Sequence, residues 1–347
     1  MSFIQPASSR FRSYLRFIIA VLWFFLARGL AHRIAVGMAN EQFVPLVEQG
    51  SLLLLLLFGY AGMGFWLERQ LQPLSEQGWP LRAGWRGEAG LGLALGWSLA
   101  VICVLPMAIA GGIAIVLNTQ ISAWGWLLAD AIFFALAAAV EEVVFRGYGF
   151  QRFADSLGGT SAALGFAAFY AVVQALLPGS TRASIAVSVV FSLLLSMAYL
   201  RSRALWLSWG LNFAWKGSRG LLFGLAVCGN TSHSPVVQGN PMGPFWLTGG
   251  GYGLDGSWIA FVVLLAALPV VYRLTRDLDY QYNAPVIVPG GRAVDIDAAA
   301  RGAHDAAMAT PAPPPLVQIL PVSALPAQML PAAAPPVAVS EPSEKAE

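Results

Sequence analysis

The chain has 347 residues, of which 57% are hydrophobic and only 11% are charged, with a formal net charge of +2 and a mean hydropathy of +0.65. Soluble globular domains carry about 25% charged residues, so this composition excludes a soluble domain. The small net charge, with basic residues in short loops rather than along a stripe, excludes nucleic-acid binding. The two cysteines, Cys103 and Cys228, form neither a CxxC pair nor a disulfide framework.

Apolar segments long enough to cross a bilayer recur along the chain, since a transmembrane helix needs about 20 mostly apolar residues. Eight such segments span residues 14–31, 44–66, 89–117, 123–145, 160–178, 183–200, 204–226 and 255–273. The first contains Arg16 and Arg28, so its alternative is an amphipathic helix on the membrane surface. The sequence therefore predicts an all-α fold, a polytopic transmembrane bundle of about eight helices.

The loop charges predict the orientation of these helices. Arginines gather in alternate loops, at Arg10, Arg12, Arg69, Arg82, Arg86, Arg152, Arg201, Arg203, Arg273 and Arg276. The intervening loops are poor in Lys and Arg, with only Arg33 and Arg182. Because cytoplasmic loops carry the excess of Lys and Arg, we expect a multi-pass membrane protein with both termini in the cytoplasm.

Composition divides the chain into three regions. We expect N-terminal transmembrane helices at 1–88, a transmembrane core at 89–275 and a disordered cytoplasmic tail at 276–347. The stretch 310–342 holds ten prolines among alanines and cannot bury a core.

Two adjacent acids, Glu141 and Glu142, end the fourth apolar segment. Ionisable groups at membrane depth cost at least ~2.5 kcal/mol each, so they usually face a cavity or a partner. Arg146 lies four positions after Glu142, on the same helix face and in the favourable order for an ion pair. The acids either snorkel from a helix end or form a polar site inside the bundle. Asp130, in the same segment, is interpreted as a packing or interface acid outside that site.

The pattern Glu-Glu-x-x-x-Arg at 141–146, followed by Gly147, resembles the first motif of the CAAX-protease and bacteriocin-processing family of intramembrane metalloproteases. The segment 205–216, LWLSWGLNFAWK, resembles the helix of that family that ends in Gly-Leu-His-Phe-Ala-Trp-Asn. The segments 245–250, FWLTGG, and 253–257, GLDGS, resemble the loop and helix start that follow it. The core at 89–275 is thereby identified as CAAX-protease-like.

The resemblance implies a metalloendopeptidase site with a water-activating glutamate, two histidines and an asparagine. The glutamate position is Glu141, but the histidine positions hold Gln174 and Asn212, and the asparagine position holds Lys216. Glu141 lies near the cytoplasmic end of its predicted span and Gln174 near the outer end of the next. Either the fifth segment starts deeper than drawn or the fourth helix continues past Arg146.

These replacements change the metal chemistry that the resemblance implies. Zinc is held by thiolate, imidazole or carboxylate groups, and amides are poor zinc ligands. We therefore expect no zinc cofactor, although an active family member would carry one. Lys216 is costly within an apolar segment unless it is paired, and we expect its ammonium group to neutralise Glu141 or Glu142. Its alternative is a snorkelling lysine.

The predicted site therefore comprises Glu141, Glu142, Arg146, Gln174, Asn212 and Lys216, with no metal ligands, and three functions fit it. The first is a CAAX-type family member with an impaired or metal-free site that binds lipidated or membrane-embedded peptides. The second is an active intramembrane protease with an altered ligand set. The third is a transporter-like protein, which the absence of internal repeats disfavours. The expected partners are membrane lipids and such a peptide.

The arginine pattern generates a topology test. Reporter domains fused after residue 230 should read as external, and reporters fused after residue 280 should read as cytoplasmic, because the flanking loops differ in Lys and Arg content. Alkaline phosphatase and fluorescent-protein fusions measure this directly, and the opposite pattern of activities contradicts the orientation.

Overall fold

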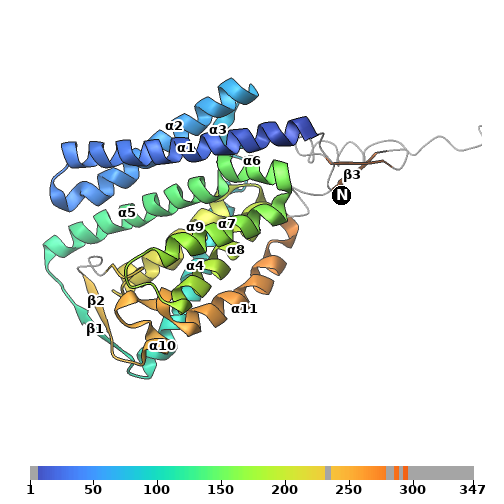
Figure 1. Ribbon diagram of the computed structural model, residues 1–347. Coiled ribbons are helices and arrows are strands. Elements are labelled where there is room, and N and C mark those ends of the chain that lie inside the picture. The colour runs from blue at the N-terminus through green and yellow to red at the C-terminus, as the bar shows by residue number, and fades with distance from the viewer. Residues whose placement is uncertain (1–6, 231–235, 279–284, 289–291, 296–347) are drawn as a thin grey trace, which may run out of the picture.

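The computed structural model describes residues 7–230, 236–278, 285–288 and 292–295, and these residues are mostly helical (Figure 1). The longer helices are α1 (Ala7–Met38), α2 (Val44–Glu68), α4 (Trp85–Ile109), α5 (Ile121–Arg146), α7 (Gly159–Ala175), α8 (Arg182–Ser202), α9 (Leu205–Gly217) and α11 (Trp258–Leu274). Each corresponds to one predicted apolar segment. Three shorter helices, α3 (Pro73–Glu76), α6 (Tyr148–Leu157) and α10 (Phe245–Thr248), were not predicted. The all-α bundle is confirmed.

Four helical stretches in the described residues are long and apolar enough to cross a membrane, namely Arg10–Met38, Glu41–Glu68, Trp85–Ile109 and Arg182–Ser202. The first includes the segment that had a surface-helix alternative, and its length favours a span. Gly159–Ala175 and Trp258–Leu274 are apolar but shorter. Large apolar side chains remain exposed, such as Phe58 at 75% and Trp66 at 81%. A lipid-facing surface has this character.

Three predicted segments end earlier than expected. The third was drawn to residue 117, but α4 ends at Ile109, shortly after Pro106 and before Gly111, whose φ of 72° belongs to the left-handed region. The seventh was drawn to residue 226, but α9 ends at Gly217 and only a π-helical turn, Ser218–Leu222, follows. The fifth was drawn to residue 178, and α7 ends at Ala175. A glycine with a positive φ follows each of these helices, namely Gly111, Gly179 and Gly224, and this conformation cannot continue a right-handed helix.

A small sheet occupies the region beyond α4. β1 (Ile113–Leu117) pairs antiparallel with β2 (Val237–Pro241), with Ile113 opposite Pro241 and Leu117 opposite Val237. β-branched residues in β1 favour an extended chain over the helix that hydropathy predicted. The predicted tail, 276–347, lies outside the described residues except for 276–278 and a second hairpin, β3 (Pro285–Val288) with β4 (Arg292–Asp295).

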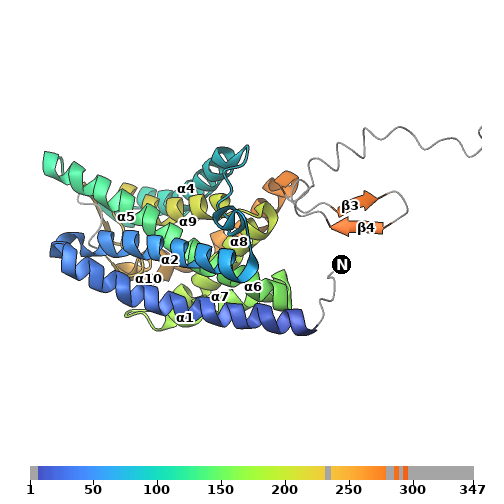
Figure 2. The same cartoon turned by 90° about the horizontal axis from the view of Figure 1, so that it is seen from above.

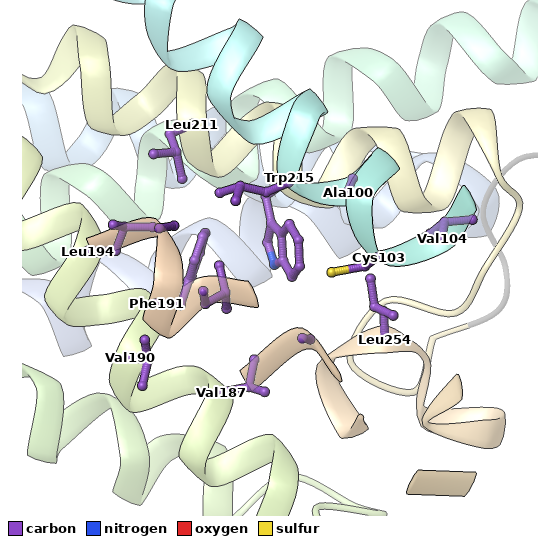
Figure 3. Close-up of a cluster of buried hydrophobic side chains, with 14 of the residues drawn as sticks. Ala100, Cys103, Val104, Val187, Val190, Phe191, Leu194, Leu211, Trp215 and Leu254 are labelled. Atoms are coloured by element: carbon purple, nitrogen blue, oxygen red, sulfur yellow. The ribbon is translucent and has the colours of Figure 1, made fainter. Parts of the chain in front are cut away.

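The helices form successive layers, which Figure 2 shows from above. α1 packs on α2, α2 on α5, and α5 on α9, while α4 and α8 also contact α9, and α11 packs on α4 and α8. The centre of the second group is Trp215, which is 1% exposed and is surrounded by side chains of α4 and α8 (Figure 3). The ring of Phe191 lies 5.9 Å from that of Trp215. This core holds α9 in the middle of the bundle.

The contact between α4 and α9 depends on glycine. A Cβ atom at Gly92 would overlap the carbonyl oxygen of Leu207, and one at Gly96 would overlap that of Leu211. Small residues let helix backbones approach closely, which is how helices commonly associate within a membrane. Close approach of α4 therefore sets the position of α9.

This contact predicts the effect of adding one methyl group. Gly96→Ala should lower the stability of the bundle by about 1–3 kcal/mol, because the new Cβ atom forces two backbones apart. Thermal unfolding of the purified protein in detergent measures the change. Gly90→Ala is the matched control, because Gly90 lies on the same helix with open space around it and alanine favours helix. Equal melting temperatures for the two variants would refute the packing argument.

Candidate functional site

The two acids of α5 point to different partners. Adjacent helical positions differ by about 100°, so Glu141 and Glu142 cannot share one face. The side chain of Glu142 is fully buried, whereas that of Glu141 is 28% exposed. Each carboxylate therefore needs its own source of positive charge.

Glu142 is neutralised within its own helix. Nη1 of Arg146 donates to Oε1 of Glu142 at 3.0 Å, and Nη2 donates to the backbone oxygen of Ser192 on α8 at 3.3 Å. The guanidinium group is buried and joins α5 to α8. This is the ion pair that the spacing of the two residues predicts.

Glu141 is neutralised from α9. Nζ of Lys216 lies 2.5 Å from Oε2 of Glu141 and also donates to Oε1. The lysine side chain is only 11% exposed. The predicted pairing of Lys216 with one of the two glutamates is confirmed, and the partner is Glu141. A snorkelling Lys216 is excluded by this geometry.

Asn212 connects the two acids. It lies one turn before Lys216 on α9, and its Nδ2 donates to Oε2 of Glu141 and to Oε1 of Glu142, both at 3.0 Å. Only the NH₂ end of the amide can face two carboxylates, because the amide oxygen is an acceptor. One neutral side chain thus links both glutamates across the α5–α9 contact.

Gln174 lies beside this network, and among the described residues it forms no hydrogen bond with it. Its Nε2 donates to the hydroxyl of Tyr252, and it lines a small cavity of about 20 Å³ together with Lys216. The structure brings the six predicted site residues into one region, of which five form the hydrogen-bonded network and Gln174 borders it.

The short helix α6 explains how Gln174 reaches the level of Glu141. α5 ends at Arg146, and the ten residues of α6 carry the chain onward before α7 turns back (Figure 1). A helix of ten residues is about 15 Å long. α7 therefore starts beyond the end of α5. Neither of the two explanations that the sequence left open is correct, because α5 ends at Arg146 and α7 starts at Gly159, only one residue before the predicted start; the separate helix α6 supplies the extra length.

A second buried ion pair borders the same cavity and was missed by the sequence analysis. Nη1 of Arg219 lies 2.7 Å from Oδ1 of Asp255, and its guanidinium group stacks 4.4 Å over the ring of Trp215. Sγ of Cys228 lies 3.5 Å from the other oxygen of Asp255. The available signal was Arg219, a second basic residue three positions after Lys216 in an apolar segment, which needs a buried acid.

The donor set does not fit zinc. Within the described residues no group of three or more His, Cys, Asp or Glu side chains is placed to hold a metal ion. The two glutamates are joined to amide and cationic groups instead. A dication at Glu141 would have to displace the Lys216 ammonium group and would be repelled by it.

The network predicts how stability responds to its disruption. Lys216→Met should lower the melting temperature, because Glu141 is left without a cation. The cost should fall below the about 3–5 kcal/mol of a fully buried pair, since Glu141 is partly exposed. Adding Glu141→Gln should recover much of the loss.

Glu142→Gln in the Lys216→Met background is the matched control. It should not recover stability, because it deprives Arg146 of its partner. Recovery by Glu142→Gln and not by Glu141→Gln would contradict the assignment of the two pairs.

A comparison with protein-family models gives one match, to the Type II CAAX prenyl endopeptidase Rce1-like family, over residues 122–218. The matched residues run from α5 to the end of α9 and contain all six predicted site residues. No curated protein gives a significant match. No solved structure does either. Together with the apolar helices, the match indicates a membrane-embedded protein whose region from α5 to α9 is similar to the Rce1-like CAAX protease family.

Proposed function

We propose that this chain uses the bundle of a CAAX-type protease to bind a lipidated or membrane-embedded peptide without a catalytic metal. The ion pair between Lys216 and Glu141 carries the proposal. At the position where the family implies an asparagine, this chain has Lys216, a cation fixed to the helix. The ammonium group neutralises the glutamate that the resemblance assigns to water activation.

Electrostatics supports a site that is closed to dications. Glu141 and Glu142 carry two negative charges, and Lys216 and Arg146 carry two positive ones. Within the bundle, where screening is weak, a balanced set of pairs is stable and an added dication is not. A metal-bound water is acidified by its metal. A lone glutamate held by lysine has no such water to activate.

A site that holds no catalytic metal can still bind a peptide, and this is the function that we propose. The polar groups of the site lie among apolar helices, so a membrane-embedded peptide would find hydrogen-bonding partners at that depth. The expected partners are therefore membrane lipids around the bundle and a lipidated peptide within it. We also propose that both termini are cytoplasmic, as the arginine-rich loops indicate.

A metal and hydrolysis assay tests this proposal. The wild-type protein should contain no stoichiometric zinc and should bind a fluorescent prenylated peptide saturably without cleaving it. The triple variant Gln174→His, Asn212→His and Lys216→Asn should gain about one equivalent of zinc, because it supplies imidazole ligands and removes the competing cation. Metal analysis and peptide mass spectrometry read out the two properties.

The control is the same triple variant with Glu141→Ala, which should lose zinc affinity. Zinc in the wild-type protein, together with hydrolysis that a chelator abolishes, would instead establish an active protease with an altered ligand set. Failure of the wild-type protein to bind the prenylated peptide would overturn the binding function.

A further inference from the structure

The β1–β2 sheet lies at the end of a helix of membrane length. α4 ends at Ile109, and β1 begins shortly after it, at Ile113. Figure 1 shows both strands at one end of the bundle, where they run across the direction of α1. One face of the sheet, with Val116 and Gln238, lines the larger cavity of the structure, of about 920 Å³. The sheet therefore closes this end of the bundle, close to the boundary of the bilayer.

The hydrogen bonds around the sheet show which backbone groups of β1 face β2. In an antiparallel pair, opposite residues alternate between pairs that exchange two hydrogen bonds and pairs that exchange none. The backbone nitrogen of Asn118 donates to the oxygen of Val236 at 2.8 Å, one position beyond the paired strands. Counted along the register from there, Val116 exchanges hydrogen bonds with Gln238. The residues of β1 whose amide and carbonyl groups point away from β2 are therefore Ile113, Ile115 and Leu117.

The outer edge of β2 is covered by the chain that follows α9. The backbone nitrogen of Gly239, which lies opposite Ile115, donates to the oxygen of Gly224 at 2.9 Å. This bond agrees with the alternation, because the amide of Gly239 points away from β1. A Cβ atom at Gly224 would overlap the backbone oxygen of Val237, so the two backbones are in direct contact. No further strand can add on this side.

The outer edge of β1 is open. Among the residues that the structure describes, no hydrogen bond reaches the outward amide or carbonyl groups of Ile113, Ile115 or Leu117. Ile113 is buried and anchors the strand, whereas Ile115, Val116 and Leu117 are 47%, 61% and 65% exposed. Edge strands are usually protected by charged residues, proline or a bulge, but β1 reads Ile-Ala-Ile-Val-Leu. Such an edge is suited to the addition of another strand.

β1 is itself complementary to this edge. Its outward residues are spaced two apart about Ile115, so two copies related by a two-fold axis match in antiparallel order. Ile115 then lies opposite Ile115 of the other copy, and Ile113 lies opposite Leu117. Each outward amide meets an outward carbonyl in this register. Because the strand carries no charge, the pairing brings no like charges together.

The membrane favours a second copy of this chain over a segment of another protein. Two copies in one bilayer have the same orientation and depth, so their β1 edges lie at the same level. Since the strands run across the helices, a two-fold axis along the membrane normal places them antiparallel (Figure 1). Where an open edge faces lipid, its backbone groups have no water to bond, and a second strand satisfies them.

We propose that this chain forms a dimer in which β1 pairs antiparallel with β1 of a second copy. The pairing joins the two-stranded sheets of both copies into one continuous sheet with the two β1 strands at its centre. This inference goes beyond the proposed function and does not depend on it, because β1 contains none of the six predicted site residues.

Energy transfer between copies in vesicles tests the proposal. Full-length chains that carry a donor or an acceptor fluorescent protein at the C-terminus are reconstituted together into phosphatidylcholine vesicles at increasing lipid content. Ile115→Pro removes the outward amide and puts a ring in its place, but it leaves the bonds to β2, which the neighbouring residues make. This variant should raise the dissociation constant of the dimer by at least about tenfold.

Ile121→Pro is the matched control. Ile121 is the first residue of α5 and is 91% exposed, and proline is favoured at the first position of a helix. This variant should dimerise as the wild type does. Ile115→Val, which keeps the amide and the branched side chain, should also dimerise. Thermal unfolding in detergent shows whether each variant keeps the bundle.

A disulfide tests the register and does not need a proline in the strand. At Ile115 the Cα atoms of the two copies should be about 5.5 Å apart, which is within the range of a disulfide. Oxidation of Ile115→Cys in vesicles should therefore link the copies covalently. Ile121→Cys is the exposed control and should not link them. The wild type, with Cys103 and Cys228, gives the background.

Two outcomes would overturn the proposal. The first is a monomer at every lipid content, which would leave the edge of β1 to an extended segment of another protein. The second is a dimer that withstands Ile115→Pro or that links through Ile121→Cys and not through Ile115→Cys, because its contact then lies on another surface. Loss of energy transfer in Ile115→Pro, with Ile121→Pro unaffected and a disulfide at Ile115→Cys, supports it.

Discussion

The cost of charge inside an apolar bundle governs this structure. Glu141 and Glu142 end an apolar run on α5, where unpaired carboxylates would be expensive. Arg146 neutralises Glu142 from the same helix, while Glu141 takes its cation from Lys216 on α9. The α5–α9 contact therefore supplies a charge that α5 does not itself provide. Asn212 strengthens that contact by donating to both acids.

The apolar packing around α9 makes this pairing possible. Gly92 and Gly96 let α4 approach α9 closely, and Trp215 fills the space between α4 and α8. The positions of Asn212 and Lys216 follow from that placement, since both lie on the face of α9 toward α5. Arg219, in the π-helical turn that follows α9, pairs with Asp255, which lines the same small cavity as Lys216. Two separate ion pairs thus hold the C-terminal end of α9 in place.

The chain keeps the order and spacing of the family motifs, but other residues occupy the histidine and asparagine positions. Residues 122–218 match the Rce1-like model, and the motif positions converge on one region of the bundle. The side chains at those positions are amides and a lysine, which form a network closed by hydrogen bonds and ion pairs. The charges of this site balance, but Oε2 of Glu142, Nε of Arg146 and Oδ1 of Asn212 are buried without a hydrogen-bond partner among the described residues. The larger cavity, at the end of the bundle, is lined by different residues, among them Phe43, Trp126 and Phe133.

The sequence by itself determined the features that depend on local pattern. Apolar runs of membrane length predicted eight helices, and a spacing of four residues predicted the pair of Glu142 with Arg146. The cost of burying Lys216 predicted an acidic partner. The ends of the helices were predicted less accurately. The apolar character of the sequence continues through β1 and through the turn after Gly217, although glycine and β-branched residues there favour other backbone conformations.

Only the tertiary structure decided the features that depend on the distance between helices. It selected Glu141 over Glu142 as the partner of Lys216, and it left Gln174 beside the network with Tyr252. It also paired Arg219 with Asp255 and assembled the large cavity from parts of the chain that are far apart in the sequence. These outcomes depend on how the helices turn and pack against one another. No local period in the sequence encodes the relative placement of groups dozens of residues apart.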